Sequence, residues 1–555
     1  MSALPIRGPV VGVALRRVFA NGYHLSDLRA DVVAGVVVAI VALPLSMALA
    51  VAIGLPPRHG VTSAVVAGAA AALLGGGKFQ VTGPSAGFVI VLAPIVEKHG
   101  LGGALVAGGM AGVILVALGL ARLGELVRFI PYPVTMGFTT GIAVVMATLQ
   151  IKDFFGLATG PLPSGFHQKL SVFWHVRHSL DPREALVGGA TLLLLAGAGR
   201  YVRRVPAPLV ALGAVTIAVA VAHHFAPSFS VATLASRFGG GLGSLSRAPV
   251  TSSLPPVADL VGPAFALAML GAIESLLSGV IADGLTRTRH DPNAELVGLG
   301  IANVLAAACG GIAATGALAR TGTNIRAGAR SPFAALTHAV VLLVTVLLFG
   351  PLVAQVPIAA LAAFLLVVAW NMAELGTLVR LVRLAPRSDL FVLVTCVLLA
   401  LLVDMVVAVG VGFMLAAVLF MRRMAELTES RLVSPESDPN LHAPKGVIVY
   451  EIEGPLFFGA AQKAMASLKT LRTSDMRVLV LHLGRVPVVD LTGFVALENA
   501  IASAERSGLD VVLAGPLPRP QSVFDRARLA ERFPRLRVEG SLEDALARAG
   551  TPDGT

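Results

Sequence analysis

Charged residues are scarce in this chain. Only 14% of its 555 residues are Asp, Glu, Lys or Arg, whereas 55% are apolar, and the mean hydropathy is +0.81. A soluble protein of this length would have three or four domains, and this chain has too few polar residues to cover their surfaces. The composition therefore excludes a soluble protein for most of the chain and favours one that lies in a lipid bilayer.

Cysteine is nearly absent, and both copies, Cys309 and Cys396, lie in apolar segments. This predicts two buried packing residues and argues against a disulfide framework or a metal site. The sequence also lacks a nucleophile–base arrangement and histidines with metal-ligand spacing, so we expect no metal, no cofactor and no enzymatic activity. The net charge of +11 comes from cations between the apolar blocks. That placement is typical of membrane topology and argues against binding to nucleic acid.

What the chain does contain is a long series of apolar blocks, many of them near the 20 residues that a helix needs to cross a bilayer. Fourteen such blocks lie at 32–53, 60–76, 84–97, 101–120, 127–150, 184–200, 206–225, 259–283, 294–309, 317–328, 332–354, 356–372, 388–403 and 405–421. No short apolar core with a cleavage site precedes them, so the first block is interpreted as a retained span and not a signal peptide.

The basic residues support this count, because alternate loops are rich in Arg and Lys. The basic loops contain Arg16, Arg17, Arg29, Lys78, Arg122, Arg128, Arg200, Arg203, Arg204, Arg287, Arg289, Arg326, Arg330, Arg380, Arg383, Arg387, Arg422 and Arg423. The connections at 310–316 and 354–358 contain none. We therefore expect a multi-pass protein of the bacterial inner (cytoplasmic) membrane with both termini in the cytoplasm.

Two blocks are too short to cross a membrane alone. One begins at Gly83-Pro84-Ser85 and the other near Thr315-Gly316-Ala317, and they are the third and the tenth block. Short segments broken by Gly or Pro at matching positions of two halves indicate an inverted-repeat transporter. The alternative is that these are ordinary membrane-helix glycines that allow close packing.

An anion that crosses a bilayer must be compensated for its lost hydration, and helix N-termini do this with unpaired N–H groups. If both short helices begin at the midplane of the bilayer, their N-termini form a pocket. The residues that would line it are Ser85, Ala86 and Gly87 on one side and Leu318, Ala319 and Arg320 on the other.

Two charged residues lie inside predicted spans, where charge is costly and function is the first expectation. Arg320 can supply the positive charge of an anion site. Glu274 is a lone carboxyl group that burial favours in its protonated form, so it is a candidate for proton coupling, and Ser278 lies one helical turn further on the same face. The alternative is that Arg320 and Glu274 form a structural pair.

The first span contains Pro44, which frees a backbone carbonyl and is tolerated best beside a cavity. Leu45, Ser46 and Leu49 are therefore candidate walls of the pocket. A kink that serves packing alone is equally compatible with the sequence.

The character of the chain changes after Arg423. Residues 425–443 are polar and are predicted to form a linker. Strand-like runs follow at 447–453, 478–483 and 511–514, and helical patterns lie at 462–471, 493–507 and 542–548. We therefore divide the chain into an N-terminal segment (1–30), a transmembrane domain (31–424), the linker, and a compact α/β domain (444–550).

With these segments in view, the chain resembles the SLC26/SulP family of anion transporters, and its tail resembles a STAS domain. The motifs that carry the resemblance are Asp31-Val32-Val33-Ala34-Gly35 through Ala42-Leu43-Pro44, Gln80-Val81-Thr82-Gly83-Pro84-Ser85, Ile273-Glu274-Ser275-Leu276-Leu277 and Ala314-Thr315-Gly316-Ala317-Leu318-Ala319-Arg320-Thr321. The resemblance implies fourteen spans as a seven-plus-seven inverted repeat with core and gate domains. It also implies a substrate held between spans three and ten, an elevator-like motion and a homodimer.

The resemblance also bears on the substrate. Sodium-coupled bicarbonate members have Asp where this chain has Glu274, and the run Trp370-Asn371-Met372 is similar to that of bacterial proton-coupled members. This favours proton-coupled uptake of C4-dicarboxylates such as fumarate or succinate. Sulfate, bicarbonate, sodium coupling, passive exchange, and a membrane sensor that signals through the STAS domain remain alternatives.

In the tail, Asp490-Leu491-Thr492-Gly493 matches the loop that is phosphorylated in STAS domains, so Thr492 and Asp490 are regulatory candidates. The same residues can form a plain helix N-cap.

Overall fold

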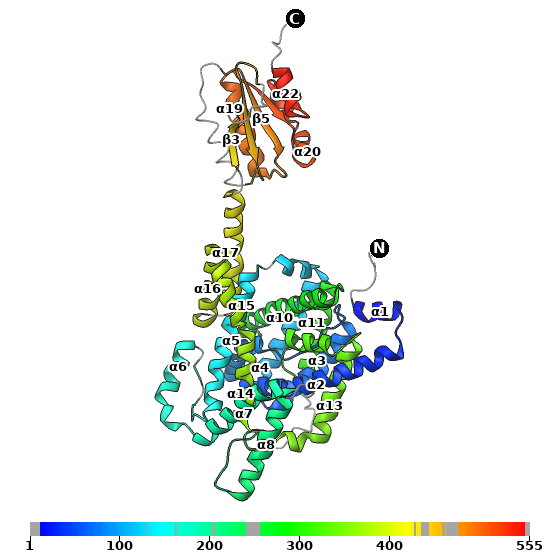
Figure 1. Ribbon diagram of the computed structural model, residues 1–555, viewed down its shortest axis with the longest axis vertical. Helices are drawn as coiled ribbons and strands as arrows, with labels where there is room; N and C mark the ends of the chain where they lie inside the picture. Colours follow the sequence, from blue (N-terminus) through cyan, green and yellow to red (C-terminus); the bar gives the residue numbers. More distant parts are fainter. Residues whose placement is uncertain are drawn as a thin grey trace. The chain divides into compact units, whose positions relative to one another are not determined.

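The computed structural model describes residues 11–549, apart from residues 130, 161, 164, 202–205, 240–255, 404, 427–428, 434–442, 458–460 and 462–475. The chain divides into two compact units, residues 1–413 and 414–555. The first contains the apolar helices and the second contains a β-sheet (Figure 1).

The first half of the apolar unit is helical except for one short strand. Its elements are α1 (Val13–Ala20), α2 (Leu25–Ala52), α3 (Pro57–Leu74), β1 (Thr82–Gly83), α4 (Ala86–Leu120), η1 (Leu123–Phe129), α5 (Tyr132–Phe154), α6 (Phe166–His175), η2 (Arg177–Ser179), α7 (Pro182–Tyr201), α8 (Ala207–Phe225) and α9 (Leu234–Phe238). The long helix α4 is broken at Gly100, where φ is +63°. Two predicted blocks, 84–97 and 101–120, are therefore the two arms of α4.

The second half begins in a similar way and adds a short amphipathic helix. Its elements are α10 (Val257–Thr286), α11 (Pro292–Ala308), β2 (Thr315–Gly316), α12 (Leu318–Arg326), α13 (Phe333–Val353), α14 (Ile358–Met372), α15 (Leu375–Leu384) and α16 (Arg387–Leu402). Helix α17 (Met405–Glu426) begins in this unit and continues into the second. Each of the fourteen predicted blocks coincides with one of these helices or helix arms. Eight helices in the described part of the chain are long and apolar enough to cross a bilayer, and the total of fourteen crossings stays a prediction.

The helices of this unit pack in two groups. Helices α2, α3, α4, α10, α11, α12 and α13 contact one another, and α5, α7, α8, α14 and α16 form the second group. Glycine allows the closest approach in the first group. A Cβ atom at Gly112 of α4 would lie 2.6 Å from the Gly300 carbonyl oxygen of α11, so the two backbones touch there.

The cysteines differ from each other. Cys396 is buried on α16, as predicted. Cys309 is exposed, because it lies at the C-cap of α11, where the helix ends. The prediction of burial is wrong for Cys309, since an apolar run in the sequence does not show where its helix ends.

The second unit contains a five-stranded sheet. Its strands, in spatial order, are β3 (Glu429–Val433), β4 (Val447–Glu453), β5 (Val478–Arg485), β6 (Asp510–Ala514) and β7 (Leu536–Glu539). Only β3 is antiparallel to its neighbour. Strand β3 lies within the predicted linker 425–443, so part of that segment belongs to the sheet. Its first three residues, Glu429, Ser430 and Arg431, are polar and resemble a loop in sequence, whereas an edge strand tolerates them.

Alternate residues of the central strands face two helical layers. Leu479, Leu481 and Leu513 pack with α19 (Leu491–Arg506), α20 (Pro518–Arg526) and α21 (Leu529–Arg532). Val480 and Val512 pack against α22 (Leu542–Ala549). The predicted helices 493–507 and 542–548 are present, and the predicted helix 462–471 lies outside the described residues.

The start of α2 is tied to the chain that precedes α13. The buried carboxylate of Asp31 accepts hydrogen bonds from the Ser331 backbone N–H (3.0 Å), the Arg330 N–H (2.6 Å), the Tyr23 hydroxyl (2.8 Å) and the Ser331 hydroxyl. Asp27, one turn earlier, forms an exposed ion pair with Arg330 (2.8 Å).

We predict that Asp31→Ala lowers the free energy of unfolding by about 3 kcal/mol, because it leaves several buried donors without an acceptor. Asp27→Ala, the matched control, is expected to have a much smaller effect, since exposed pairs contribute little. Thermal unfolding of the two variants in detergent tests this. An equal loss of stability in both would contradict the role assigned to Asp31.

Candidate functional site

Two short strands bring together segments that are more than 230 residues apart in the sequence. Thr82 pairs with Gly316 and Gly83 pairs with Thr315, in antiparallel register. Helix α4 begins three residues after Gly83, and α12 begins two residues after Gly316. Because the strands are antiparallel, the two helices leave the ladder in opposite directions and both N-termini point back toward it. This is the arrangement that the sequence predicts for two broken helices.

Further hydrogen bonds hold this ladder, which we call the crossing ladder (residues 82–83 and 315–316). The Ala317 N–H donates to the Val81 carbonyl oxygen (3.2 Å), and the Val81 N–H donates to Thr321 Oγ1 (3.2 Å). Thr315 Oγ1 donates to the Gly271 carbonyl oxygen (2.9 Å), which joins the ladder to α10. The ladder is thus supported from both α10 and α12.

The helix N-termini beside the ladder keep unused donors. Among the described residues, the backbone N–H groups of Leu318, Ala319 and Arg320 donate to no protein acceptor, and the side chains of Leu318 and Ala319 are exposed. On α4, Ser85 is the N-cap, and its hydroxyl accepts a long hydrogen bond (3.3 Å) from the Gly87 N–H. Unpaired amides at a helix N-terminus attract an anion.

Arg320 lies under the crossing ladder. Its side chain is only 1% exposed, and Nη2 donates to the Pro84 carbonyl oxygen (3.0 Å) and weakly to Ser46 Oγ (3.4 Å). In the described part of the chain, Arg320 forms no ion pair, and its Nε and Nη1 atoms have no hydrogen-bond partner. The guanidinium is therefore a buried positive charge that pairs with no carboxylate among the described residues. Its acceptor, Pro84, is the residue before the N-cap of α4.

Glu274 contacts the other helix N-terminus. Its Oε2 atom accepts a hydrogen bond of 2.5 Å from the Ser85 hydroxyl. A Cβ atom at Gly87 would collide with Glu274 Oε1, so the carboxyl group lies directly against the α4 backbone. The alternative of an Arg320–Glu274 pair is not what the structure has, because each residue binds the start of α4 separately.

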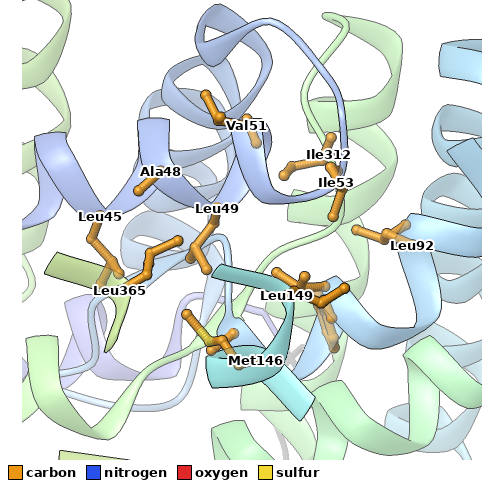
Figure 2. Close-up of a cluster of buried hydrophobic side chains, with 14 of the residues drawn as sticks. Leu45, Ala48, Leu49, Val51, Ile53, Leu92, Met146, Leu149, Ile312 and Leu365 are labelled. Atoms are coloured by element: carbon orange, nitrogen blue, oxygen red, sulfur yellow. The ribbon is translucent and has the colours of Figure 1, made fainter. Parts of the chain in front are cut away.

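The remaining predicted residues divide between the site and its surroundings. Ala86 is buried in the first turn of α4, and Ser278 is buried on α10 with no partner for its hydroxyl among the described residues. Leu45 and Leu49 lie after Pro44 on α2. Figure 2 shows them in an apolar cluster with Met146, Leu149 and Leu365. They therefore line the apolar seam between the two helix groups and not the polar centre.

Three polar residues that the sequence analysis missed hold the chain that leads to the ladder. Glu295 of α11 accepts hydrogen bonds from the N–H groups of Gly76 (3.0 Å) and Gly77 (2.9 Å) and from Ser275 Oγ (3.1 Å). Gln80 Nε2 donates to Ser275 Oγ (2.7 Å). For Ser275 and Glu295 the signal in the sequence is a polar residue inside an apolar block, whereas Gln80 lies between two blocks.

His338 is a further residue that was missed. It is fully buried on α13, and neither ring nitrogen has a partner in the described part of the chain. A Cβ atom at Gly68 would lie 3.1 Å from the Thr82 carbonyl oxygen and 3.8 Å from His338 Nδ1, so the imidazole lies beside β1.

In the second unit, Asp490 is the N-cap of α19, and its Oδ1 atom accepts a hydrogen bond from the Gly493 N–H (2.6 Å). Thr492 is half-buried in the first turn of the same helix. The capping role is present in the structure, and the regulatory role stays a prediction.

Comparison with known proteins shows the family to which the chain belongs. Residues 28–396 match the model of the sulfate permease family, and residues 438–545 match the STAS domain. The chain belongs to the sulfate permease family. This confirms the predicted fold class, a helical membrane domain followed by a STAS domain.

Similar proteins cover almost the whole chain. YvdB of Bacillus subtilis, named as a candidate sulfate transporter, is 37% identical over 92% of this chain and 96% of its own length. The bicarbonate transporter BicA of Picosynechococcus is 31% identical over 95% of this chain and 96% of its own length. The structure named "The overall structure of SLC26A9" matches with a TM-score of 0.83, covering 97% of this chain and 92% of that chain. Its sequence identity is 19%, so it shows the fold alone.

We predict that Gly83→Ala strongly impairs function without unfolding the protein, because the added Cβ atom would collide with Arg320 Nη1 and displace the guanidinium. Gly262→Ala on α10 is the matched control, since a Cβ atom there meets nothing within 4 Å. Anion uptake into proteoliposomes, assayed with labelled sulfate, bicarbonate and fumarate, should fall at least about tenfold for Gly83→Ala, a loss of about 1.4 kcal/mol. Normal uptake by a well-folded Gly83→Ala variant would show that the position of Arg320 is not important.

Proposed function

We propose that this protein is a secondary active transporter of a small oxyanion, and that sulfate is the substrate. The observation that carries the proposal is the meeting of two helix N-termini at the crossing ladder, with the buried Arg320 guanidinium beneath it. The anion would bind the free amides of Leu318, Ala319 and Arg320 and those at the start of α4.

The charges at this site suit a divalent anion. Each helix N-terminus acts as a partial positive charge, worth about 0.3–1 kcal/mol when exposed and up to about 2 kcal/mol when partly buried. Arg320 adds a full charge that no carboxylate neutralises among the described residues. Burying an unpaired charge is costly, so a bound anion would recover part of that cost.

Glu274 acts in this proposal as an anion tethered to the site. Its carboxyl group lies against Ser85 and Gly87, where the substrate would contact α4. When ionised it would repel the substrate, and when protonated it would donate a hydrogen bond instead. Protonation of Glu274 would therefore favour anion binding, which couples uptake to protons. Ser278 would complete the coupling site, and sodium is the alternative ion.

The names of the relatives guide the choice of substrate. YvdB is named for sulfate, and so are homologues in Mycobacterium tuberculosis. These relatives give no support to the C4-dicarboxylates that the sequence analysis favours. Bicarbonate is the second candidate, because BicA is 31% identical over most of both chains.

The remaining expectations are part of the same proposal. The Arg-rich loops favour cytoplasmic termini in a bacterial inner membrane, with transport by an elevator-like movement of the α2–α4 and α10–α13 group against the other helices. The resemblance to the family favours a homodimer. Light scattering of the purified protein would test the last point.

The decisive experiment is uptake of labelled sulfate, bicarbonate and fumarate into proteoliposomes that contain the full-length protein. We expect sulfate to accumulate when the outside is acidic and to be competed by unlabelled sulfate. Accumulation of fumarate but not sulfate would overturn the substrate, and no uptake of any anion would overturn the transport function.

We predict that Glu274→Gln removes the stimulation of uptake by an inward proton gradient, because glutamine cannot change its charge. Rates of Glu274→Gln measured with and without the gradient should agree, whereas the wild type should differ about tenfold, corresponding to about 1.4 kcal/mol. Glu125→Gln, at an exposed position in η1, is the control and should keep the stimulation. A Glu274→Gln variant that still responds to the gradient would remove Glu274 from the coupling mechanism.

A further inference from the structure

The membrane unit contains a cavity of about 450 Å³ beside the C-terminal end of α2. Its walls come from the C-terminal end of α2, the first arm of α4, the end of α5, helix α6 and the end of α16. These elements belong to both helix groups, so the cavity opens between them. In the predicted topology this end of α2 faces away from the cytoplasm.

Two lysines give this cavity its charge. Lys152, in the last turn of α5, and Lys169 of α6 both line it, and both are half-buried. Glu97 is the one acidic residue among the described lining residues. The nearby Asp153 does not offset the lysines, because its buried carboxylate pairs with Arg237 (2.8 Å). The cavity therefore carries a net positive charge.

The partial burial of the lysines strengthens their field. Burial lowers the pKa of Lys169, and the Glu97 carboxylate opposes this shift. An ammonium group that has lost part of its water interacts with an anion through a medium of lower dielectric constant than bulk water. Clefts lined by charge of one sign concentrate the opposite ion.

The floor of the cavity is apolar and leads toward the site. Ile53 and Leu149 line the cavity and also belong to the apolar cluster that contains Leu49 and Leu92 (Figure 2). Leu49 and Leu92 lie further along α2 and α4, toward Ser46 and Ser85. The positive cavity and the crossing ladder are thus separated by packed apolar side chains and not by a polar barrier.

We propose that Lys152 and Lys169 form an outer binding site for the transported oxyanion, which collects it before the apolar cluster opens. This inference rests on the proposed function. The two lysines lie at the opening of the cavity. They hold the anion weakly and only raise its local concentration. The outer site therefore affects the apparent KM for entry from this face and leaves the maximal rate of entry unchanged.

The test uses right-side-out and inside-out membrane vesicles with the full-length protein and labelled sulfate. In the Lys152→Gln/Lys169→Gln variant, the apparent KM for entry from the cavity face should rise about tenfold with an unchanged maximal rate. Added inert salt should slow entry in the wild type much more than in the variant, because it screens the lysines. The same salt added only on the other face should not slow entry, because it does not reach the lysines.

Two controls separate charge from structure. Lys152→Arg/Lys169→Arg keeps the charges and should restore the wild-type KM. Lys98→Gln removes an exposed lysine that pairs with Asp259 (3.0 Å) and is not among the lining residues, so it should have no effect. Wild-type vesicles that take up sulfate together with a double Gln variant of unchanged KM would overturn the outer site alone. Equal slowing by salt added at either face would also overturn it, whereas wild-type vesicles without uptake would overturn the proposed function.

Discussion

The site depends on one constraint: extended backbone inside a membrane domain must have its polar groups satisfied by protein. Lipid offers no hydrogen bonds, so the stretches that lead to α4 and α12 would be too costly if each stood alone. Their pairing as β1 and β2, and the side chains of Thr315 and Thr321 around them, meet this requirement. Once the strands pair, both helices must begin beside the ladder, and their N-termini converge without any further interaction.

The same constraint accounts for the polar residues around the ladder. Glu295 satisfies the amides of Gly76 and Gly77, and Gln80 links the chain before β1 to Ser275 of α10. These residues hold the approach to β1, although Gln80 Oε1 has no partner in the described chain. Arg320 differs from Gln80 because it carries a charge, and two of its nitrogens remain without partners among the described residues. A buried group that the fold leaves incomplete is a natural place for a ligand to bind.

Much of this arrangement could be predicted from the sequence. Apolar blocks locate the helices. The Gly83-Pro84-Ser85 and Thr315-Gly316-Ala317 breaks locate the starts of α4 and α12, because backbone chemistry there is local. The contacts of Arg320 and Glu274 could not be predicted, since they depend on which elements pack together. The edge strand β3 was interpreted as a linker because an exposed strand needs no apolar pattern, and His338 gave no signal beyond a single polar residue in an apolar block.

The distribution of charge between the outer cavity and the crossing ladder follows from what the transport of an anion requires. A site must attract an anion strongly enough to replace its water but release it again. Two full positive charges, those of the half-buried Lys152 and Lys169, lie in the cavity, where the anion still keeps part of its water. At the centre, where screening is lost, the anion would contact amide dipoles, and the one guanidinium is held back by its bond to the Pro84 carbonyl. Glu274 lies against the start of α4, so its ionised form would compete with the anion for these amide dipoles. The anion could then be released while the crossing ladder stays intact.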